Sequence, residues 1–465
     1  MRELLSQVLE HLQPVIETVE STPVDQSDSV RPELLLRLKE DVPGAGESLD
    51  SVLQLLLDEA MPPSLSAISG GFMGYVPGGG LFHSALADLI SGTINRYVGA
   101  HPVAPALSEI EASVIRWFCQ IIGLPAEARG FMTSGGSLAN QSALTIARTI
   151  KCDESFGDAI IYLSDQAHGC LSKAAKLCGF PKRNIRIVET DDNFRMSMAA
   201  LRDAVTDDRS KGLNPMFVAA NAGTTNSGAI DPLEEVARFC HNENIWFHID
   251  AAYGGFFAIT QRGRSKLSGI SEADSIALDP HKTLFLPYGT GALLVRNGDW
   301  LKQTYQSEAD YLPDTLGDDD AMDFRDISPE LTRPFRGLRV WLPLKVHGAD
   351  AFAACLDEKM DLIARVYASI KSNPALDVLA SPELSIMAFA MTAKPDETIE
   401  SQNERSRQLL ARINQKNRVH LSGTLLKGRY ALRVAVGVYR THESHIDILL
   451  ADLQASINEL EEIND

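Results

Sequence analysis

The chain has 465 residues, of which 45 % are hydrophobic and 23 % charged, a composition typical of a soluble globular protein with ample material for a core. Acidic residues outnumber basic ones by 62 to 43, and the resulting net charge of −19 argues against nucleic acid or an anionic membrane as a partner. At this length we expect one large domain with smaller appendages.

Cysteine usage and the first residues of the chain indicate a cytoplasmic protein. The six cysteines lack CxxC pairing, which is typical of reduced structural thiols rather than of a disulfide framework or a zinc site. The N-terminus has the pattern of an amphipathic helix with acidic residues, unlike a signal peptide. No apolar run approaches the ~20 residues of a membrane span. No His/Asp/Glu cluster has metal-ligand spacing, so we expect no metal.

The first 300 residues predict helices followed by a parallel sheet. Residues 1–60 read as helices punctuated by prolines, and residues 69–80 are rich in glycine. From about residue 82 to 300, helical segments alternate with short apolar runs, which is typical of βαβ units with helices on both faces of a mainly parallel sheet. The predicted strands are residues 159–163, 216–220, 245–249 and 275–278.

The remaining third of the chain predicts a different organisation. Residues 305–334 are polar, acidic and interrupted by prolines, which favours a long loop that serves as a functional lid or is disordered. A helix over 341–369 and a strand over 430–436 follow. We therefore predict an α/β fold with three parts: an N-terminal helical segment, a large domain and a small C-terminal α+β domain. Their predicted bounds are 1–81, 82–347 and 348–465.

The residues that could act in catalysis or cofactor binding follow the ends of the predicted strands. Asp250 closes the apolar run 245–249, and Lys282 follows His281 shortly after the next strand. A buried lysine amine can form a Schiff base with pyridoxal phosphate (PLP), and a carboxylate can keep the pyridine nitrogen protonated, so that the ring acts as an electron sink. A helix cap is the alternative role of Asp250, but a carboxylate that ends so apolar a strand needs a partner.

Three further segments follow strands in the same way. Gly135, Gly136 and Ser137 form a turn that opens a helix, where backbone N–H groups and the helix dipole favour a phosphate, although such turns are often structural. His168 comes after the first predicted strand, where an isolated histidine can also be merely solvated or capping. Thr224 offers a hydroxyl at the same sheet edge, and Ala252 is small enough for a flat ring to lie against the backbone.

In this order, these elements resemble the fold-type I PLP enzymes, and among them the group II amino-acid decarboxylases, over residues 60–450. The resemblance implies that Lys282 is the Schiff-base lysine, that Asp250 is the partner of the pyridine nitrogen and that His168 stacks on the ring opposite Ala252. The remaining cofactor-binding residues that it implies are Gly135, Gly136, Ser137, Thr224 and His281. It also implies a homodimer with shared active sites.

The resemblance extends to the substrate. Tyr75 and Pro77 match the substrate-pocket segment of the family, and Arg433 matches an arginine that meets the substrate carboxylate in many fold-type I enzymes; a structural salt bridge is its alternative role. An aromatic or apolar L-amino acid is favoured over glutamate, because the sequence offers no obvious second arginine for a side-chain carboxylate. Asp279 is a departure, since several relatives carry asparagine there. A carboxylate repels a phosphate, so we expect Asp279 to cap local backbone.

Phe324 is the second departure. Aligned without gaps from the downstream segment 333–338, it stands where the family carries the tyrosine that protonates Cα after CO₂ leaves. Among relatives, phenylalanine here accompanies decarboxylation with oxidative deamination to an aldehyde, ammonia and hydrogen peroxide. The alternative is that another group protonates Cα and the product is the amine. The candidate donors are His168, Lys282, Tyr305, Tyr311 or a residue of a partner chain.

Two other classes of function remain open from the sequence. One is a different reaction on the same fold, such as a carbon–carbon lyase or a transaminase. The other is a non-catalytic relative used as a binding or scaffold protein, against which the intact Lys282, Asp250 and His168 argue.

Overall fold

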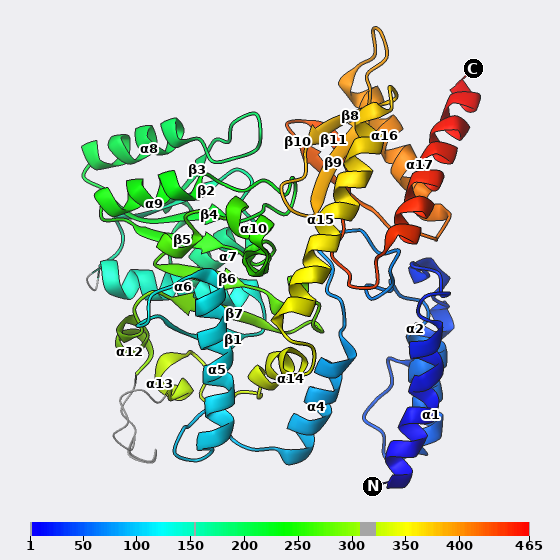
Figure 1. Cartoon of the computed structure of the whole chain (residues 1–465), viewed down its shortest axis with the longest axis horizontal. Helices are drawn as coiled ribbons and strands as arrows, with labels where there is room; N and C mark the ends of the chain where they lie inside the picture. The colour runs from blue at the N-terminus through cyan, green and yellow to red at the C-terminus, as the bar shows by residue number, and fades with distance from the viewer. Residues whose placement is uncertain (1, 153–154, 307–321, 465) are drawn as a thin grey trace.

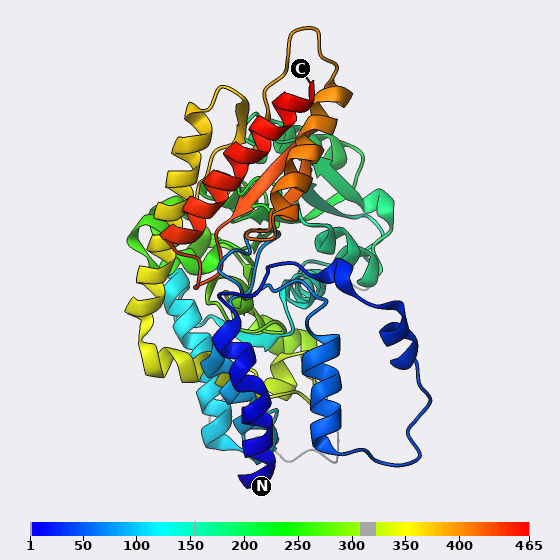
Figure 2. The ribbon, with the colours of Figure 1, turned by 90° about the vertical axis from the view of Figure 1, so that its right-hand side faces the viewer.

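The computed structural model describes residues 2–152, 155–306 and 322–464 (Figure 1). It begins with an arm of helices that lies apart from the central sheet (Figure 2). The arm contains α1 (Arg2–Thr18), α2 (Pro32–Arg37) and α3 (Leu49–Gln54). Helices were expected here, but Pro14 lies inside α1 instead of ending it.

A seven-stranded sheet forms the centre of the molecule, in the order β1-β7-β6-β5-β4-β2-β3. Only β7 runs antiparallel to its neighbours, so the sheet is mainly parallel, as predicted. Its strands are β1 (Arg129–Thr133), β2 (Ala159–Ser164), β3 (Ile185–Val188), β4 (Asn214–Asn221), β5 (Trp246–Asp250), β6 (Ser275–Leu278) and β7 (Gly291–Val295).

Helices cover both faces of this sheet (Figure 1). The right-handed crossovers of parallel strands put α6 and α7 on one face and α8 to α10 on the other. The helices of this part are α4 (Phe82–Ile94), α5 (Pro105–Ile122), α6 (Gly136–Lys151), α7 (Gly169–Leu177), α8 (Met198–Ser210), α9 (Leu233–Asn242), α10 (Gln261–Lys266), α11 (Pro280–Thr283) and α12 (Asp299–Tyr305).

The register of the parallel strands brings their carboxyl ends to one edge. Asn221 of β4 pairs with Asp250 of β5, and Asp250 pairs with Ala277 of β6. The strands are apolar on both faces because helices bury both, which is why short uninterrupted apolar runs predicted them correctly. Side chains that follow these strands therefore gather at one sheet edge.

The segment after the central sheet differs in part from the prediction. The expected helix over 341–369 is two helices, α14 (Gly337–His347) and α15 (Ala349–Ser372), separated by Gly348, whose φ of 77° is unfavourable for other residues. Within the expected loop over 305–334, residues 322–327 include the short helix α13 (Phe324–Ile327), while residues 307–321, with Tyr311, lie outside the described residues.

The C-terminal part has its own antiparallel sheet and core. Its four strands follow the order β10-β11-β9-β8; α15 and α16 pack on them, and α17 packs against α15 and α16. The elements are β8 (Leu376–Ala380), β9 (Ile386–Met391), α16 (Ile399–Gln415), β10 (Ser422–Leu426), β11 (Arg429–Ala435) and α17 (Glu443–Asn464). The α/β class is confirmed, whereas the three domain boundaries stay predictions. None of the helices among the described residues is long and apolar enough to cross a membrane.

Candidate active site

A cavity of about 420 Å³ opens at the carboxyl edge of the central sheet. The turn before α6, the start of α7 and the segments after β4, β5 and β6 form its walls. The lining residues are Ser134, Gly135, Gly136, Ser137, Asn140, His168, Cys170, Asn221, Gly223, Thr225, Asp250, Ala252, Tyr253, Asp279, His281 and Lys282. Eight of the nine predicted cofactor-binding residues are thus brought together from four segments of the chain.

Asp250 is buried and receives two hydrogen bonds. The Asn140 amide donates to its Oδ2 at 3.0 Å, and the backbone N–H of Ala252 donates to its Oδ1 at 3.1 Å. Donors of this kind stabilise the ionised carboxylate. Two donors therefore hold the Asp250 carboxylate in place at the wall of the cavity, where it can pair with a protonated ring nitrogen.

A chain of buried hydrogen bonds stands behind Asp250. Because Asn140 Nδ2 faces a carboxylate, its Oδ1 is the atom that accepts from His248 Nε2 at 2.8 Å. His248 Nδ1 then accepts from the Ser275 hydroxyl at 2.9 Å, and this hydroxyl accepts from Trp246 Nε1 at 2.8 Å. Burial lowers the pKa of His248 to about 4, so the imidazole is neutral, as this donor pattern requires.

Lys282 lies on the opposite side of the cavity with Asp279 beside it. Its Nζ is 3.1 Å from Asp279 Oδ2. Burial opposes the charged amine, but Asp279 and Asp250 outweigh it and raise the pKa of Lys282. The expectation that Asp279 caps local backbone is wrong, because its side chain makes no capping hydrogen bond at α11 and faces Lys282 instead.

The glycine turn has the geometry of an anion site. A Cβ built at Gly136 lies 3.1 Å from Asp279 Oδ2 and 3.2 Å from Ala252 Cβ, so a side chain there would narrow the cavity. Gly136 begins α6, a helix of 16 residues whose free N–H groups and dipole favour a phosphate. The His281 ring stands beside Gly135 and is fixed by the hydrogen bond that its Nδ1 makes with the Thr290 carbonyl oxygen at 2.7 Å.

His168 and Ala252 line the cavity from two different elements. His168 caps α7, where its Nδ1 accepts from the N–H of Cys170, and Ala252 lies in the turn after β5. Thr225 lines the cavity, whereas the Thr224 hydroxyl, which the sequence favoured, is hydrogen-bonded to Ser227 at 2.7 Å and lies outside the lining.

The predicted substrate residues do not line this cavity. Tyr75 is 59 % exposed, and Pro77 is buried against Gly437. Arg433 is buried and donates to Ser422 Oγ at 3.0 Å and to the Tyr75 carbonyl oxygen at 2.9 Å. It forms no salt bridge with a described residue, and its two hydrogen bonds join β11 to Ser422 of β10 and to the backbone of Tyr75.

Phe324 and Tyr305 also lie away from the cavity lining. Phe324 is fully buried, and the guanidinium carbon of Arg333 lies 4.5 Å from its ring centroid. The Tyr305 ring meets Phe131 edge-on at 6.0 Å, and burial raises the pKa of its hydroxyl. Within its own chain, Tyr305 is therefore not placed to donate a proton to a group in the cavity.

Sequence reasoning missed Asn140, Cys170 and Asp279 as lining residues. Asn140 could have been found, because it follows Gly136 by four residues and so shares its helix face. Cys170 carries no comparable signal. Burial raises the pKa of its thiol to about 11, so it is a protonated wall residue rather than a nucleophile.

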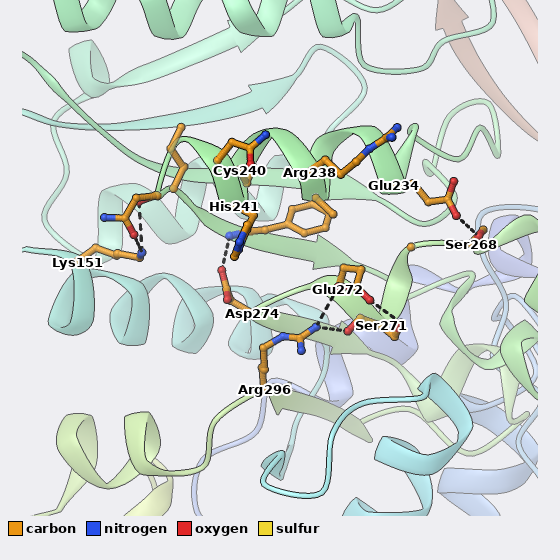
Figure 3. Close-up of a pocket in the computed structure, with 16 residues that line it drawn as sticks. Lys151, Glu234, Arg238, Cys240, His241, Ser268, Ser271, Glu272, Asp274 and Arg296 are labelled. Carbon is orange, nitrogen blue, oxygen red and sulfur yellow. Dashed lines mark hydrogen bonds and ion pairs between the residues drawn. The ribbon is translucent and has the colours of Figure 1, made fainter.

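A second, larger cavity of about 880 Å³ lies at the opposite edge of the sheet, and Figure 3 shows its lining. Its charged groups are used locally: Lys151 donates to Asn244, Asp274 accepts from the Phe247 N–H, and Arg296 binds the Ser271 carbonyl oxygen. In α/β sheets, ligands bind at the carboxyl ends of the strands. The smaller cavity is therefore the candidate active site.

Comparison with known proteins identifies the family of the chain. The model of the pyridoxal-dependent decarboxylase conserved domain matches residues 32–392. The chain belongs to this family. It is 32 % identical over 453 residues to an aromatic-L-amino-acid decarboxylase of Bacillus atrophaeus, covering 97 % of this chain and 94 % of the relative.

Two further relatives cover nearly the whole chain. A phenylacetaldehyde synthase of Arabidopsis thaliana is 28 % identical over 460 residues, covering 96 % of this chain and 93 % of the relative. The crystal structure of Oryza sativa TDC with PLP and tryptamine has a TM-score of 0.93 at 25 % identity, covering 99 % of this chain and 98 % of that one. The family, the fold and the carboxy-lyase class predicted from the sequence are thereby confirmed.

The residues of the cavity fit PLP, the cofactor of the family. The lysine amine, the ionised aspartate and the glycine turn that a Cβ would fill are complementary to an aldehyde, a pyridinium and a phosphate. This decarboxylase thus keeps the apparatus of a PLP enzyme in one cavity.

Proposed function

We propose that this decarboxylase converts an aromatic or apolar L-amino acid to the corresponding amine. The observation that carries the proposal is the convergence of Lys282, Asp250 and His168 in one cavity beside the glycine turn. The aromatic class is supported by the relative from Bacillus atrophaeus, which is named for aromatic L-amino acids.

Each residue has a defined task in this proposal. Bound PLP supplies an electron sink for the bond that breaks when CO₂ leaves. Lys282 would anchor the cofactor, and its amine would hold a proton near Cα of the substrate. Asp250 keeps the ring nitrogen protonated, and the hydrogen-bond chain through Asn140 and His248 fixes its orientation. His168 and Ala252 confine the flat ring.

We propose that the substrate is bound by Arg433 together with the segment that contains Tyr75 and Pro77. Arg433 carries a buried charge, and its Nε has no hydrogen-bond partner among the described residues. The guanidinium also holds the Tyr75 carbonyl oxygen, so the charge and the aromatic ring belong to one unit. We propose that this unit receives the substrate carboxylate and side chain, together with Pro77, when the site is complete in a homodimer.

A product assay tests the proposal. PLP-loaded protein is incubated in air with each of the standard L-amino acids, amines and aldehydes are identified by mass spectrometry, and peroxide is followed in parallel. The expected result is an amine from one or a few aromatic or apolar amino acids, lost in Lys282→Ala. The absence of both amine and aldehyde would contradict decarboxylation of these substrates.

The second candidate function is oxidative. Phe324 cannot donate a proton, and the phenylacetaldehyde synthase among the relatives bears the name of an aldehyde product. In this reaction one amino acid, O₂ and water give an aldehyde, CO₂, ammonia and hydrogen peroxide. Because Phe324 is buried in the described position, it determines which product forms only if its segment moves to the active site or reaches the active site of a partner chain.

The substitution Phe324→Tyr separates the two reactions. General acid help contributes about 10²–10⁴-fold to proton transfer, so an aldehyde-forming wild type should become mainly amine-forming in the variant. Phe335→Tyr makes the same chemical change in the neighbouring segment and should leave the product ratio unchanged. If wild type and Phe324→Tyr both give only amine, the oxidative function is excluded.

The assembly and location of the enzyme remain predictions. We propose a homodimer with shared active sites in the cytoplasm, built from the three parts 1–81, 82–347 and 348–465. The exposed apolar residues of the N-terminal arm and α4 support an interface; they include Leu5, Leu9, Leu36, Leu89 and Ile90.

A further inference from the structure

Asp279 is a carboxylate that the decarboxylation chemistry leaves unexplained. It follows β6 and is 2 % exposed. Its Oδ2 faces Lys282 Nζ at 3.1 Å and His281 Nε2 at 3.7 Å, whereas its Oδ1 is buried without a hydrogen-bond partner among the described residues. A buried carboxylate oxygen without a donor is costly, which indicates that a group absent from the protein itself completes the site.

The oxygen without a hydrogen-bond partner among the described residues, Asp279 Oδ1, lies beside the glycine turn formed by residues 135–137. A Cβ built at Gly135 lies 3.9 Å from Asp279 Oδ1, and one built at Gly136 lies 3.1 Å from Oδ2. The turn contributes no charged side chain. The other titratable lining residues are His281 and Lys282 beside Asp279, Asp250 at the end of β5 and Tyr253 after it, and His168 and Cys170 at the start of α7. Asp279 is thus the carboxylate nearest to the proposed phosphate position.

Two requirements conflict at this position. A phosphate dianion repels an ionised carboxylate in a buried site. An ammonium has no lone pair, so Lys282 must lose a proton before it can attack an aldehyde, and its raised pKa opposes that loss. One proton transfer across the 3.1 Å contact removes both obstacles, since it leaves a neutral amine and a neutral carboxylic acid.

We propose that Asp279 is a catalytic base for cofactor capture, which takes a proton from the Lys282 ammonium as the PLP phosphate enters the glycine turn. One Lys282 N–H bond breaks and one Asp279 O–H bond forms. The Lys282 lone pair then attacks the cofactor aldehyde, and the carbonyl oxygen leaves as water with the two remaining amine protons. The neutral Asp279 turns about its Cβ–Cγ bond, so that the protonated oxygen takes the unpartnered position beside Gly135 and donates a hydrogen bond to the phosphate. The inference rests on the proposed phosphate position.

The test is the pH profile of PLP capture by cofactor-free protein, followed by the absorbance of lysine-bound cofactor. In the wild type the proton moves inside the Asp279–Lys282 pair, so no proton exchanges with solvent before capture. In Asp279→Asn the amine must lose its proton to solvent, so the capture rate depends on the free amine fraction. We expect the ratio of variant to wild-type rate to rise about tenfold per pH unit below the pKa of the variant amine.

The ratio cancels the titration of PLP itself. It does not cancel the titrations of His281 and Cys170, because the charge of Asp279 acts to raise the pKa of both groups, but the loss of that charge is common to every neutral Asp279 variant. Asp279→Ser provides a second neutral variant, for which the same slope is expected. Asp274→Asn is the matched control, because Asp274 precedes the same strand at the opposite sheet edge (Figure 3) and should follow the wild-type profile.

The outcomes separate the inference from the function on which it rests. Parallel profiles for wild type and both Asp279 variants, with normal lysine-bound cofactor, overturn the role of Asp279 and leave PLP binding intact. A wild type that never develops the absorbance overturns both. A steep ratio in the Asp279 variants alone supports the proposal.

Discussion

Replacing Asn140 by leucine tests the hydrogen-bond chain behind Asp250 most directly. The two side chains have similar size, but leucine cannot donate to Asp250 Oδ2 or accept from His248 Nε2. His248 is fully buried and so cannot recruit bulk water in place of the amide, whereas Asp250 lines the cavity. The substitution therefore leaves a charged acceptor, Asp250 Oδ2, and a neutral donor, the His248 Nε2–H group, without the hydrogen bonds that Asn140 makes with them.

The magnitude follows from the two lost bonds. A hydrogen bond to a charged group contributes about 1.5–3 kcal/mol, and a buried donor without a partner costs about 1–3 kcal/mol. Asp250 keeps the Ala252 N–H, so the lower half of these ranges applies to it. We expect Asn140→Leu to lower the free energy of unfolding by about 3 kcal/mol and to weaken PLP binding by about tenfold or more.

Urea unfolding of the cofactor-free protein measures the stability. All four tryptophans lie between residues 117 and 341, outside the C-terminal sheet, so their fluorescence reports on the central part of the molecule. Gln141→Leu is the matched control on the same helix, because the Gln141 side chain makes no hydrogen bond with a described residue in the structure. Its cost should stay within about 0.5 kcal/mol.

A double-mutant cycle of Asn140→Leu with His248→Phe decides whether the two side chains are energetically coupled through their hydrogen bond. When both side chains are apolar, neither leaves a buried polar group of the other without a partner. The double variant should therefore lose at least about 1 kcal/mol less free energy of unfolding than the sum of the losses of the two single variants. Additive costs, or an Asn140→Leu protein as stable as the control, would refute the reasoning that the amide supports Asp250 through shared hydrogen bonds.

Three other substitutions probe the site and its supports. Glu111→Gln breaks the fully buried pair with Arg333, so urea unfolding should show a loss of about 3–5 kcal/mol. Because burial lowers the pKa of His248 to about 4, its stabilising effect is present above the unfolded pKa and is lost as pH falls from 6.5 to 4. Unfolding measured across this window should therefore be less pH-dependent in His248→Phe, by up to about 3 kcal/mol. Gly136→Ala should weaken PLP binding in equilibrium titrations about tenfold without changing the circular dichroism, because its Cβ enters the cradle.

The strand edge of the site could be predicted from the sequence for a physical reason. Strands buried on both faces appear as short apolar runs, and parallel strands must end at one edge. The polar residues after those runs, from His168 to Lys282, therefore had to gather there. The contribution of β7, which runs antiparallel, did not disturb this inference because it carries no residue of the cavity.

Residues whose roles depend on packing between elements could not be predicted in the same way. Asn140 reaches Asp250 only because α6 crosses the sheet above β5. Phe324 could be aligned with the tyrosine of the family, but its burial against Arg333 depends on how the segment after residue 321 folds back. Asp279 was read as repelled by a phosphate, which is correct for its charge, but the sequence does not show that its side chain faces the ammonium of Lys282 instead of capping backbone.

The two carboxylates that flank Lys282 illustrate how environment assigns opposite tasks to one residue type. Asp250 and Asp279 end neighbouring strands at the same edge, yet Asp250 receives donors on both oxygens and Asp279 has one oxygen without any. A carboxylate surrounded by donors gains little from a proton, so Asp250 suits a permanent charge opposite a ring nitrogen. A carboxylate with a free buried oxygen gains a hydrogen-bond donor when it is protonated, and a phosphate needs such a donor. In other sites with two carboxylates, the same difference in environment decides which carboxylate is the acid and which stays ionised. Here the difference in the number of hydrogen-bond donors assigns Asp279 to cofactor capture and Asp250 to the reaction that follows.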